Sequence, residues 1–186
     1  MRTRLIFLLI IAIYLQGCAV IKDVPSYKID SLNKKNYSKL NGLYSNIHSD
    51  TTVISYSDHV LAYQPKTLWS HTYSFNNDKE KGNAETQAVK LEFKTRRKIL
   101  LSLYEKDSLI SNRVIRGRIK NDFFYRRPHF VLIPLIPIVV SYDTYRYRIG
   151  IINNGLVLDY KWNYWGFALL AGGWGKGQTS TTFKKQ

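Results

Sequence analysis

The feature that most constrains the fold is a strict alternation of apolar and polar side chains over several short segments. Val89, Leu91 and Phe93 are separated by Lys90, Glu92 and Lys94. Successive side chains of a β-strand point to opposite faces, so this pattern predicts a strand with one buried and one solvated face. The same alternation recurs over residues 115–120, 144–151 and 156–160. We therefore expect a mainly β chain built from half-buried antiparallel strands.

Short turn sequences separate these segments. The signals are Lys106-Asp107-Ser108, Asn121-Asp122 and Asn153-Asn154-Gly155, and Asn-Gly suits a type I′ turn with positive φ at both central residues. Short connections predict that consecutive strands are antiparallel neighbours. We predict a single antiparallel meander of about eight or nine strands, with a short helix near residues 66–75. The expected strands are 41–48, 51–57, 88–95, 98–105, 109–120, 123–127, 138–152, 155–162 and 164–171.

The N-terminus has the three parts of an export signal: basic Arg2 and Arg4, an apolar run over residues 5–15, and the small residue Gly17. A transmembrane helix needs about 20 apolar residues, and this run is shorter. The sequence Leu15-Gln16-Gly17-Cys18 resembles the lipobox of bacterial lipoproteins. The resemblance implies cleavage between Gly17 and Cys18 and attachment of acyl chains, palmitate among them, to Cys18. Because the chain has one cysteine, no thiol then remains for a disulfide, a metal or a nucleophile.

Composition and charge divide the chain into four parts. We predict a signal peptide at residues 1–17, a lipid-anchored tether at 18–38, a β domain at 39–177 and a polar C-terminal tail at 178–186. The β domain is long enough to bury a sizeable core. A second resemblance concerns its first strand, where Leu40-Asn41-Gly42-Leu43-Tyr44 is similar to the Gly-x-Trp signature that opens lipocalins, with Tyr44 in place of Trp. It implies a lipocalin-like or calycin-like barrel, and a β-sandwich or an open, strongly curved sheet are the alternatives.

The chain is strongly basic, with 28 Lys and Arg against 13 Asp and Glu. Basic residues with interleaved aromatics would suit nucleic acid, but an exported, lipid-anchored protein argues against that partner. The alternation places five basic residues on the polar faces of strands, where they form either an ordinary solvated surface or a contact with anionic lipid head groups. These residues are Arg116, Arg118, Lys120, Arg146 and Arg148.

Catalysis has little support in the sequence. The four histidines, at 48, 59, 71 and 129, are dispersed and lack metal-ligand spacing, and no Gly-x-Ser-x-Gly elbow is present. Ser31-Leu32-Asn33-Lys34 matches Ser-x-x-Lys, a short pattern in the predicted tether. We therefore expect no enzyme activity, no metal and no cofactor.

Two apolar groups are candidates for binding. Residues 130–140 are apolar and contain Pro134 and Pro137, which cannot donate to a sheet ladder, so we interpret them as an irregular crossing or rim loop. They form either buried core, an apolar lip on a cavity, or a surface that rests on a membrane. Large aromatics on strands fill the core or line a ligand cavity. The candidate cavity residues are Tyr44, Tyr145, Tyr147, Trp162, Trp165 and Phe167.

The expected function is non-catalytic binding by a lipoprotein of the bacterial cell envelope. Ala19 follows Cys18 where some bacteria use Asp to retain a lipoprotein in the inner membrane, which favours the outer membrane. The leading hypothesis is a barrel that binds an apolar or amphipathic small molecule or lipid. The alternative is a structural or assembly lipoprotein that binds another envelope protein, or an anionic membrane surface, through its basic face. An open interior favours the first, and a packed interior beside an exposed apolar patch favours the second.

Overall fold

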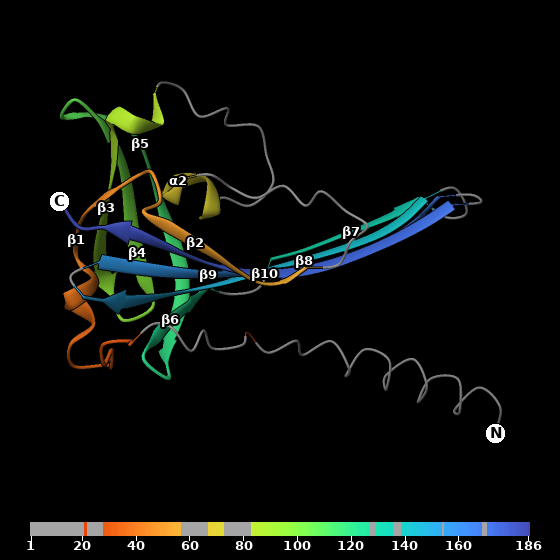
Figure 1. Cartoon of the computed structure of the whole chain (residues 1–186), viewed down its shortest axis with the longest axis horizontal. Coiled ribbons are helices and arrows are strands. Elements are labelled where there is room, and N and C mark those ends of the chain that lie inside the picture. The colour runs from red at the N-terminus through yellow and green to blue at the C-terminus, as the bar shows by residue number, and fades with distance from the viewer. Residues whose placement is uncertain are drawn as a thin grey trace.

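The computed structural model describes residues 21, 28–56, 67–72, 83–126, 129–135, 139–153, 155–168 and 171–186. The predicted signal peptide, the lipobox and Cys18 lie outside these residues. The described part is mainly β, as predicted, and its strands form one antiparallel sheet that curls into a half-barrel (Figure 1). The ten described strands are β1 (Gly42–Ser45), β2 (Asp50–Tyr56), β3 (Gln87–Thr95), β4 (Lys98–Glu105), β5 (Ser108–Lys120), β6 (Phe123–Arg126), β7 (His129–Leu135), β8 (Val139–Ile152), β9 (Gly155–Ala168) and β10 (Ala171–Lys184).

The sheet order is β1-β3-β4-β5-β6-β8-β9-β10-β2, and β7 pairs with β8 outside this path. Apart from β7, each strand from β3 to β10 lies beside its successor, which confirms the predicted meander. The segment 42–56 behaves differently because it pairs at both ends of the order. Its β1 part pairs with β3 and its β2 part pairs with β10, and an isolated bridge joins Tyr44 to Lys185. This segment therefore holds the two ends of the curled sheet together.

Two-residue turns set the register of the meander. Lys106 and Asp107 have φ of 46° and 66°, and Asn121 and Asp122 have φ of 47° and 62°. Positive φ at both central residues matches the twist of the strands, so these predicted hairpins are confirmed. The third turn is centred one residue earlier than its Asn-Gly pair suggests, because Ile152 pairs with Gly155 and Gly155 is the first residue of β9.

The apolar faces of the strands meet inside the half-barrel. Alternation places Val89, Leu91 and Phe93 there with less than a tenth of each side chain exposed. They belong to one contiguous core cluster, whose other members are Leu32, Leu40, Tyr44, Leu68, Trp69, Ile99, Leu101, Leu103, Ile115, Phe124, Tyr147, Ile149, Ile151, Leu156, Leu158, Tyr160, Trp162 and Phe183.

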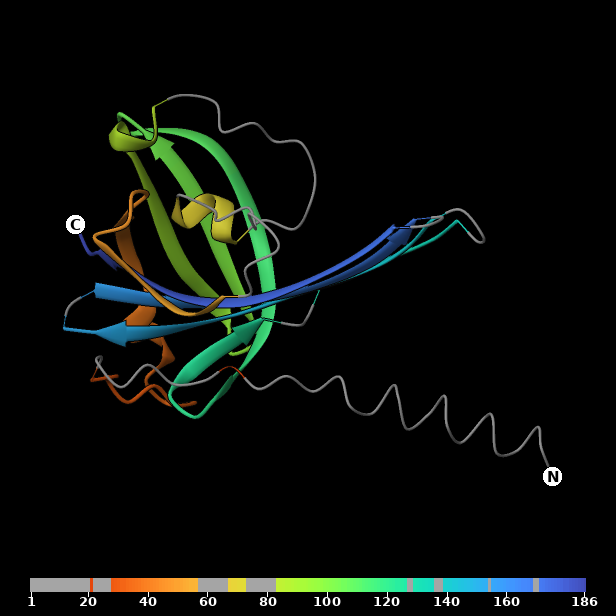
Figure 2. The same cartoon turned by 45° about the vertical axis from the view of Figure 1, so that its right-hand side comes forward.

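Three strands are longer than the half-barrel that they help to build. β8, β9 and β10 each have 14 residues. Beyond the core their far halves continue away from the body as a projecting arm, together with β7 (Figures 1 and 2). We use "arm" for residues 130–135, 139–144, 163–168 and 171–176, which lie beyond the register row of the core residue Trp162. The expected break between a strand at 155–162 and another at 164–171 is wrong, because β9 is continuous through the polar residue Asn163.

Residues 129–135 form a strand where we expected an irregular crossing. Pro134 lies opposite Val140 in the register of β7 with β8, and β7 has no second partner in the described sheet. Proline is tolerated in an edge strand because the outer side of such a strand needs no ladder donor. Pro134 is therefore compatible with its place in a strand. Pro137 lies outside the described residues.

The prediction of a polar C-terminal tail at residues 178–186 is also corrected by the structure. Residues 178–184 form the second half of β10, and residues 178–183 are buried. Gln178, Thr179, Ser180, Thr181 and Thr182 are polar enough to suggest a tail, but β10 lies between β9 and β2 and its backbone pairs on both sides. β-Branched threonine fits such a strand well.

The predicted tether contacts the domain before residue 38. Leu32 is 1% exposed and belongs to the core cluster, and its backbone N–H donates to the carboxylate of Asp122 at 3.1 Å. Asp30 forms an isolated bridge with Ile151. The described residues 28–38 therefore pack on the body, because a single buried leucine is enough to dock a segment that is otherwise polar.

A short helix within the expected range 66–75 is confirmed as α2 (Leu68–His71). Thr67 is its N-cap, and a capping box links Thr67 with Ser70. Asn46 docks this helix on the sheet from the bend between β1 and β2. Its side-chain oxygen accepts from the backbone N–H of Trp69 at 2.9 Å, and its amide donates to the side chain of Gln87 at 3.0 Å. The remaining helical elements are η1 (Tyr37–Leu40) and η2 (Ala84–Thr86).

We expect Asn46→Ala to lower the free energy of unfolding by about 1–3 kcal/mol, because it leaves the backbone N–H of Trp69 and the amide of Gln87 buried without these partners. Asn112→Ala removes the same side chain at an exposed position of β5 and serves as the control. Urea unfolding of both variants measures the difference. Equal effects would show that Asn46 does not hold the helix in place.

Candidate functional site

The predicted cavity residues divide into two groups. Tyr44, Tyr147 and Trp162 lie in the core cluster with at most 6% of each side chain exposed, and Tyr145 packs against the cluster. Trp165 is 48% exposed, and alternation along β9 puts it on the face opposite Trp162. Phe167 belongs to the part of β9 whose side chains the structure does not describe. The structure therefore brings three of the six residues together as core.

The polar part of the interior lies at the end covered by α2. The guanidinium carbon of Arg113, on β5, lies 3.7 Å from the ring centroid of Trp69, and Arg113 donates hydrogen bonds to the backbone oxygen of Trp69 and the hydroxyl of Thr72. Arg126, on β6, donates to the backbone oxygen of Thr72 at 3.2 Å and lies 5.3 Å from the ring centroid of Tyr147. Two cationic side chains thus meet the C-terminal end of α2, where helix carbonyls accept hydrogen bonds and favour positive charge.

The titratable groups beside this end are held neutral. Burial, with a smaller contribution from the charge of His48, lowers the pKa of His71 to about 3. Burial raises the pKa of Tyr147 to about 12, although the nearby Arg126 and Arg113 act in the opposite direction. The pKa of Tyr44 is also about 12 because of burial. At pH 7 His71 and Tyr147 are therefore uncharged, and the end covered by α2 has two guanidinium cations, Arg113 beside the ring of Trp69 and Arg126 beside that of Tyr147.

We expect a pH dependence of stability from His71. An unfolded histidine has an ordinary pKa near 6.5 and binds a proton as the pH falls, whereas folded His71 stays neutral down to about pH 3. The stability is therefore complete above about pH 6.5 and falls by about 1.4 kcal/mol per pH unit between that pH and 3. His71→Phe keeps a ring against Tyr160 and Phe183 and should reduce this slope between pH 7 and 5.

Urea unfolding at pH 7, 6 and 5 measures that slope. His48→Gln, at an exposed position, is the control and should retain most of it, because burial is the larger cause of the shift. A slope that is the same in His71→Phe and the native chain would contradict the assignment.

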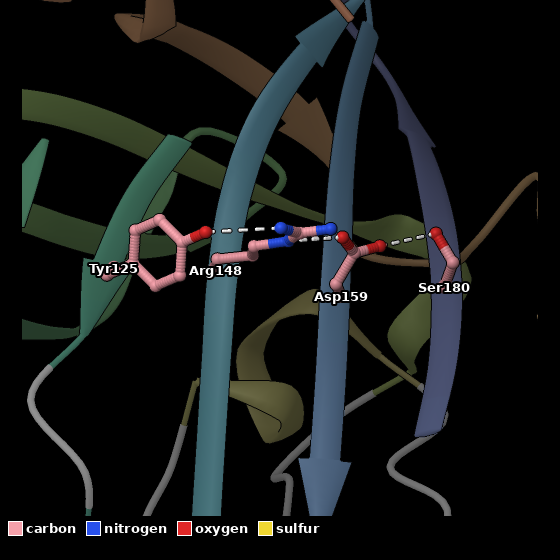
Figure 3. Close-up of polar contacts among 4 residues, drawn as sticks. All are labelled: Tyr125, Arg148, Asp159 and Ser180. Carbon is pink, nitrogen blue, oxygen red and sulfur yellow. Dashed lines mark hydrogen bonds and ion pairs between the residues drawn. The ribbon is translucent and has the colours of Figure 1, made fainter. Parts of the chain in front are cut away.

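A second polar group crosses the outer face of the sheet. Tyr125, Arg148, Asp159 and Ser180 occupy one register row on β6, β8, β9 and β10 (Figure 3). The Nε of Arg148 lies 2.6 Å from Oδ2 of Asp159, and its Nη1 donates to the hydroxyl of Tyr125 at 3.1 Å. The hydroxyl of Ser180 donates to the other carboxylate oxygen at 2.6 Å.

This row corrects the prediction for Arg148. Its side chain is 4% exposed and its guanidinium lies 3.9 Å from the ring centroid of Phe123, so it cannot meet an anionic surface. Sequence alternation puts Arg148 correctly on the polar face, but it does not show that Phe123 covers that face. Three of the predicted basic-surface residues are exposed on β5, and Arg146 is half-buried on β8. The exposed three are Arg116, Arg118 and Lys120, and Lys98 lies directly opposite Arg116 on β4.

We expect Arg148→Met to lower the free energy of unfolding by about 3–5 kcal/mol, because it leaves the carboxylate of Asp159 buried without its cation. Lys94→Met is the matched control. The Lys94–Glu92 pair has the same 2.6 Å distance, but its side chains are 50% and 38% exposed, so we expect Lys94→Met to change the stability little. Chemical denaturation compares the two, and equal losses would mean that burial does not strengthen the Arg148–Asp159 pair.

The sequence pattern did not single out Arg113, Arg126 or Asn46, and Trp69 was expected only as part of the short helix near residues 66–75. A signal for Arg113 was available, because it shares its parity along β5 with the buried residue Ile115. The contact of Arg113 with Trp69 depends on where α2 packs, and strand periodicity contains no such information.

Among the described residues, no cluster of three or more His, Cys, Asp or Glu side chains could hold a metal ion. Within the same residues, no helix combines the length and apolar character that crossing a membrane requires. Comparisons with protein families, with characterised proteins and with solved structures found no match for this chain. The candidate sites therefore stand on their geometry alone.

Proposed function

We propose that the protein is a non-catalytic, lipid-anchored lipoprotein of the bacterial cell envelope that acts by binding an anionic membrane surface through its basic face. The observation that supports a surface function is the interior of the half-barrel. Tyr44, Tyr147 and Trp162, expected to be cavity walls, are instead members of one contiguous core. A packed interior leaves the outer surface as the part that binds.

The basic face supports an anionic partner. Three exposed cations occupy alternate positions on the outer side of β5, namely Arg116, Arg118 and Lys120. Lys98 on β4 lies directly opposite Arg116. Four cations on two adjacent strands create a local positive potential that attracts negative head groups. Each basic residue near such a surface contributes about 1 kcal/mol to binding.

Vesicle sedimentation tests this proposal. Every variant is the full-length chain with Cys18→Ala, so the leader is common to all of them. Binding to neutral vesicles gives the baseline. We expect Arg116→Gln with Arg118→Gln to weaken binding to anionic vesicles about thirtyfold relative to neutral ones, which corresponds to two lost contacts.

The matched control is Lys106→Gln with Lys184→Gln, which removes the same charge from exposed positions outside the basic face. It should have a much smaller effect in 0.1 M salt, where charges separated by more than about 10 Å are largely screened. Equal losses in both variants, or equal binding of the native face to neutral vesicles, would reject the proposal.

Lipid attachment has its own test. We expect the native chain to incorporate labelled palmitate and to lose residues 1–17 in a bacterial host, because a lipobox directs both steps. Cys18→Ala should abolish the label and leave the leader attached, as seen by mass spectrometry of the purified protein. Labelling that persists in this variant would overturn the assignment of Cys18.

The small-molecule hypothesis remains a second candidate because of Arg113 and Arg126 at the α2 end. Two guanidiniums beside aromatic rings would suit the anionic head of an amphipathic molecule. Mass spectrometry of small molecules that co-purify with the chain tests this candidate directly, and Arg113→Gln should reduce the amount recovered.

A further inference from the structure

The arm has a row of large apolar residues across its four strands. Trp165 on β9 lies directly opposite Trp174 on β10, and Tyr142 on β8 lies opposite Trp165. Leu132 on β7 continues the same row beside Tyr142. Residues that share a register row also share a face of the sheet. Trp165 and Trp174 therefore lie side by side on one face of the arm, and Tyr142 and Leu132 hold the next two positions of the same register row.

The two tryptophans of this row are exposed, whereas the other two tryptophans of the chain are buried. Trp165 and Trp174 are 48% and 53% exposed, whereas Trp69 and Trp162 are 4% and 6% exposed. Figures 1 and 2 show that the arm projects well clear of the half-barrel, so a broad flat surface could reach it without touching the body. Adjacent exposed tryptophans on a projecting element are typical of an interaction site.

Charge along the arm is graded from its tip to its base. Residues 130–142 and 164–175 contain no Asp, Glu, Lys, Arg or His. Toward the body, Arg146 and Lys161 lie opposite each other on β8 and β9, and Lys176 has its ammonium 5.9 Å from the ring centroid of Trp174. Asp143, opposite Tyr164, is the first charged residue after the tryptophan row, and the basic residues follow it toward the body. Where proteins enter a lipid–water interface, apolar residues lie deepest, tryptophans lie at the level of the head groups and basic side chains lie outside them. The arm has its uncharged tip, its tryptophan pair and its basic residues in that sequence.

We propose that the arm inserts its tip into one leaflet of a lipid bilayer, with Trp165 and Trp174 at the level of the head groups. This inference deepens the proposed function and rests on its membrane location, but it uses different residues and an apolar rather than an ionic contact.

Length and hydrogen bonding set the depth of insertion. The uncharged part of β9 from Tyr164 to Ala168 covers about 17 Å at about 3.3 Å per residue, roughly half of the 30 Å hydrocarbon core. β2 pairs with β10 only over Gly177–Thr182, so the β10 edge at residues 171–176 has no partner strand in the described sheet. Unpaired backbone groups are costly in hydrocarbon. A shallow position near the head groups fits both constraints, and a transmembrane position fits neither.

The tryptophans themselves provide the test. The full-length chain with Cys18→Ala is mixed with phosphatidylcholine vesicles whose acyl chains are brominated near the head groups, because bromine quenches tryptophan emission only at short range. The leader contains no tryptophan and is common to every variant, so it contributes the same background to each. We expect quenching at least about twofold greater in the native arm than in Trp165→Phe with Trp174→Phe, which retains only the two buried tryptophans.

A second pair of variants tests binding itself. We expect Trp165→Lys with Trp174→Lys to weaken binding to these neutral vesicles about tenfold or more, because burying half of one large apolar side chain already accounts for about that factor. Leu109→Lys with Val114→Lys introduces the same charges at positions of β5 that are 52% and 55% exposed, and it should change binding little.

Three results would overturn the inference: equal quenching in the native chain and the phenylalanine variant, equal weakening by the two lysine pairs, or a blue shift of emission that follows protein concentration and not lipid. The third would assign the arm to contact with a second copy of the chain. Because the vesicles are neutral, failure of the basic face to bind anionic lipid would leave this test unaffected.

Discussion

The three-stranded ladder of β8, β9 and β10 is the interaction on which the rest of the structure depends. Each strand has 14 residues, and pairing runs from the turn after Ile152 to the far end of the arm. Near that turn the ladder contributes Ile149, Leu158 and Phe183 to the core. Farther along, the same continuous hydrogen bonding carries the strands beyond the body. An arm of this length is stable because its backbone groups stay paired with neighbours that are anchored in the core.

Closure of the half-barrel depends on a bend in one segment. β1 pairs with β3 and β2 pairs with β10, so the bend at Asn46 must satisfy its backbone and side chain away from the ladder. Asn46 does so by bonding to Gln87 and to α2, which places Trp69 beneath Arg113. The helix, the cationic end of the interior and the closure of the sheet are therefore one connected arrangement.

The distribution of charge separates structural cations from those available for binding. Arg148 is buried against Asp159 and Phe123, whereas Arg116 and Arg118 are exposed on a neighbouring part of the sheet. The proposed membrane contacts use the exposed cations and the uncharged tip of the arm. Electrostatic attraction acts over about a Debye length, and tryptophan burial requires contact, so the two surfaces would act at different stages of approach to a bilayer.

Strand type, the two-residue turns at Lys106 and Asn121, and the short helix were predictable from local sequence, because side-chain periodicity and turn chemistry act over a few residues. The resemblance of residues 15–18 to a lipobox likewise supports a prediction about Cys18 from local pattern alone. Only the tertiary structure decided that the polar residues 178–183 lie within a strand, that Leu32 belongs to the core and that Arg148 is buried. These outcomes depend on which segments cover each face of the sheet, and such long-range contacts leave no periodic signal in the sequence.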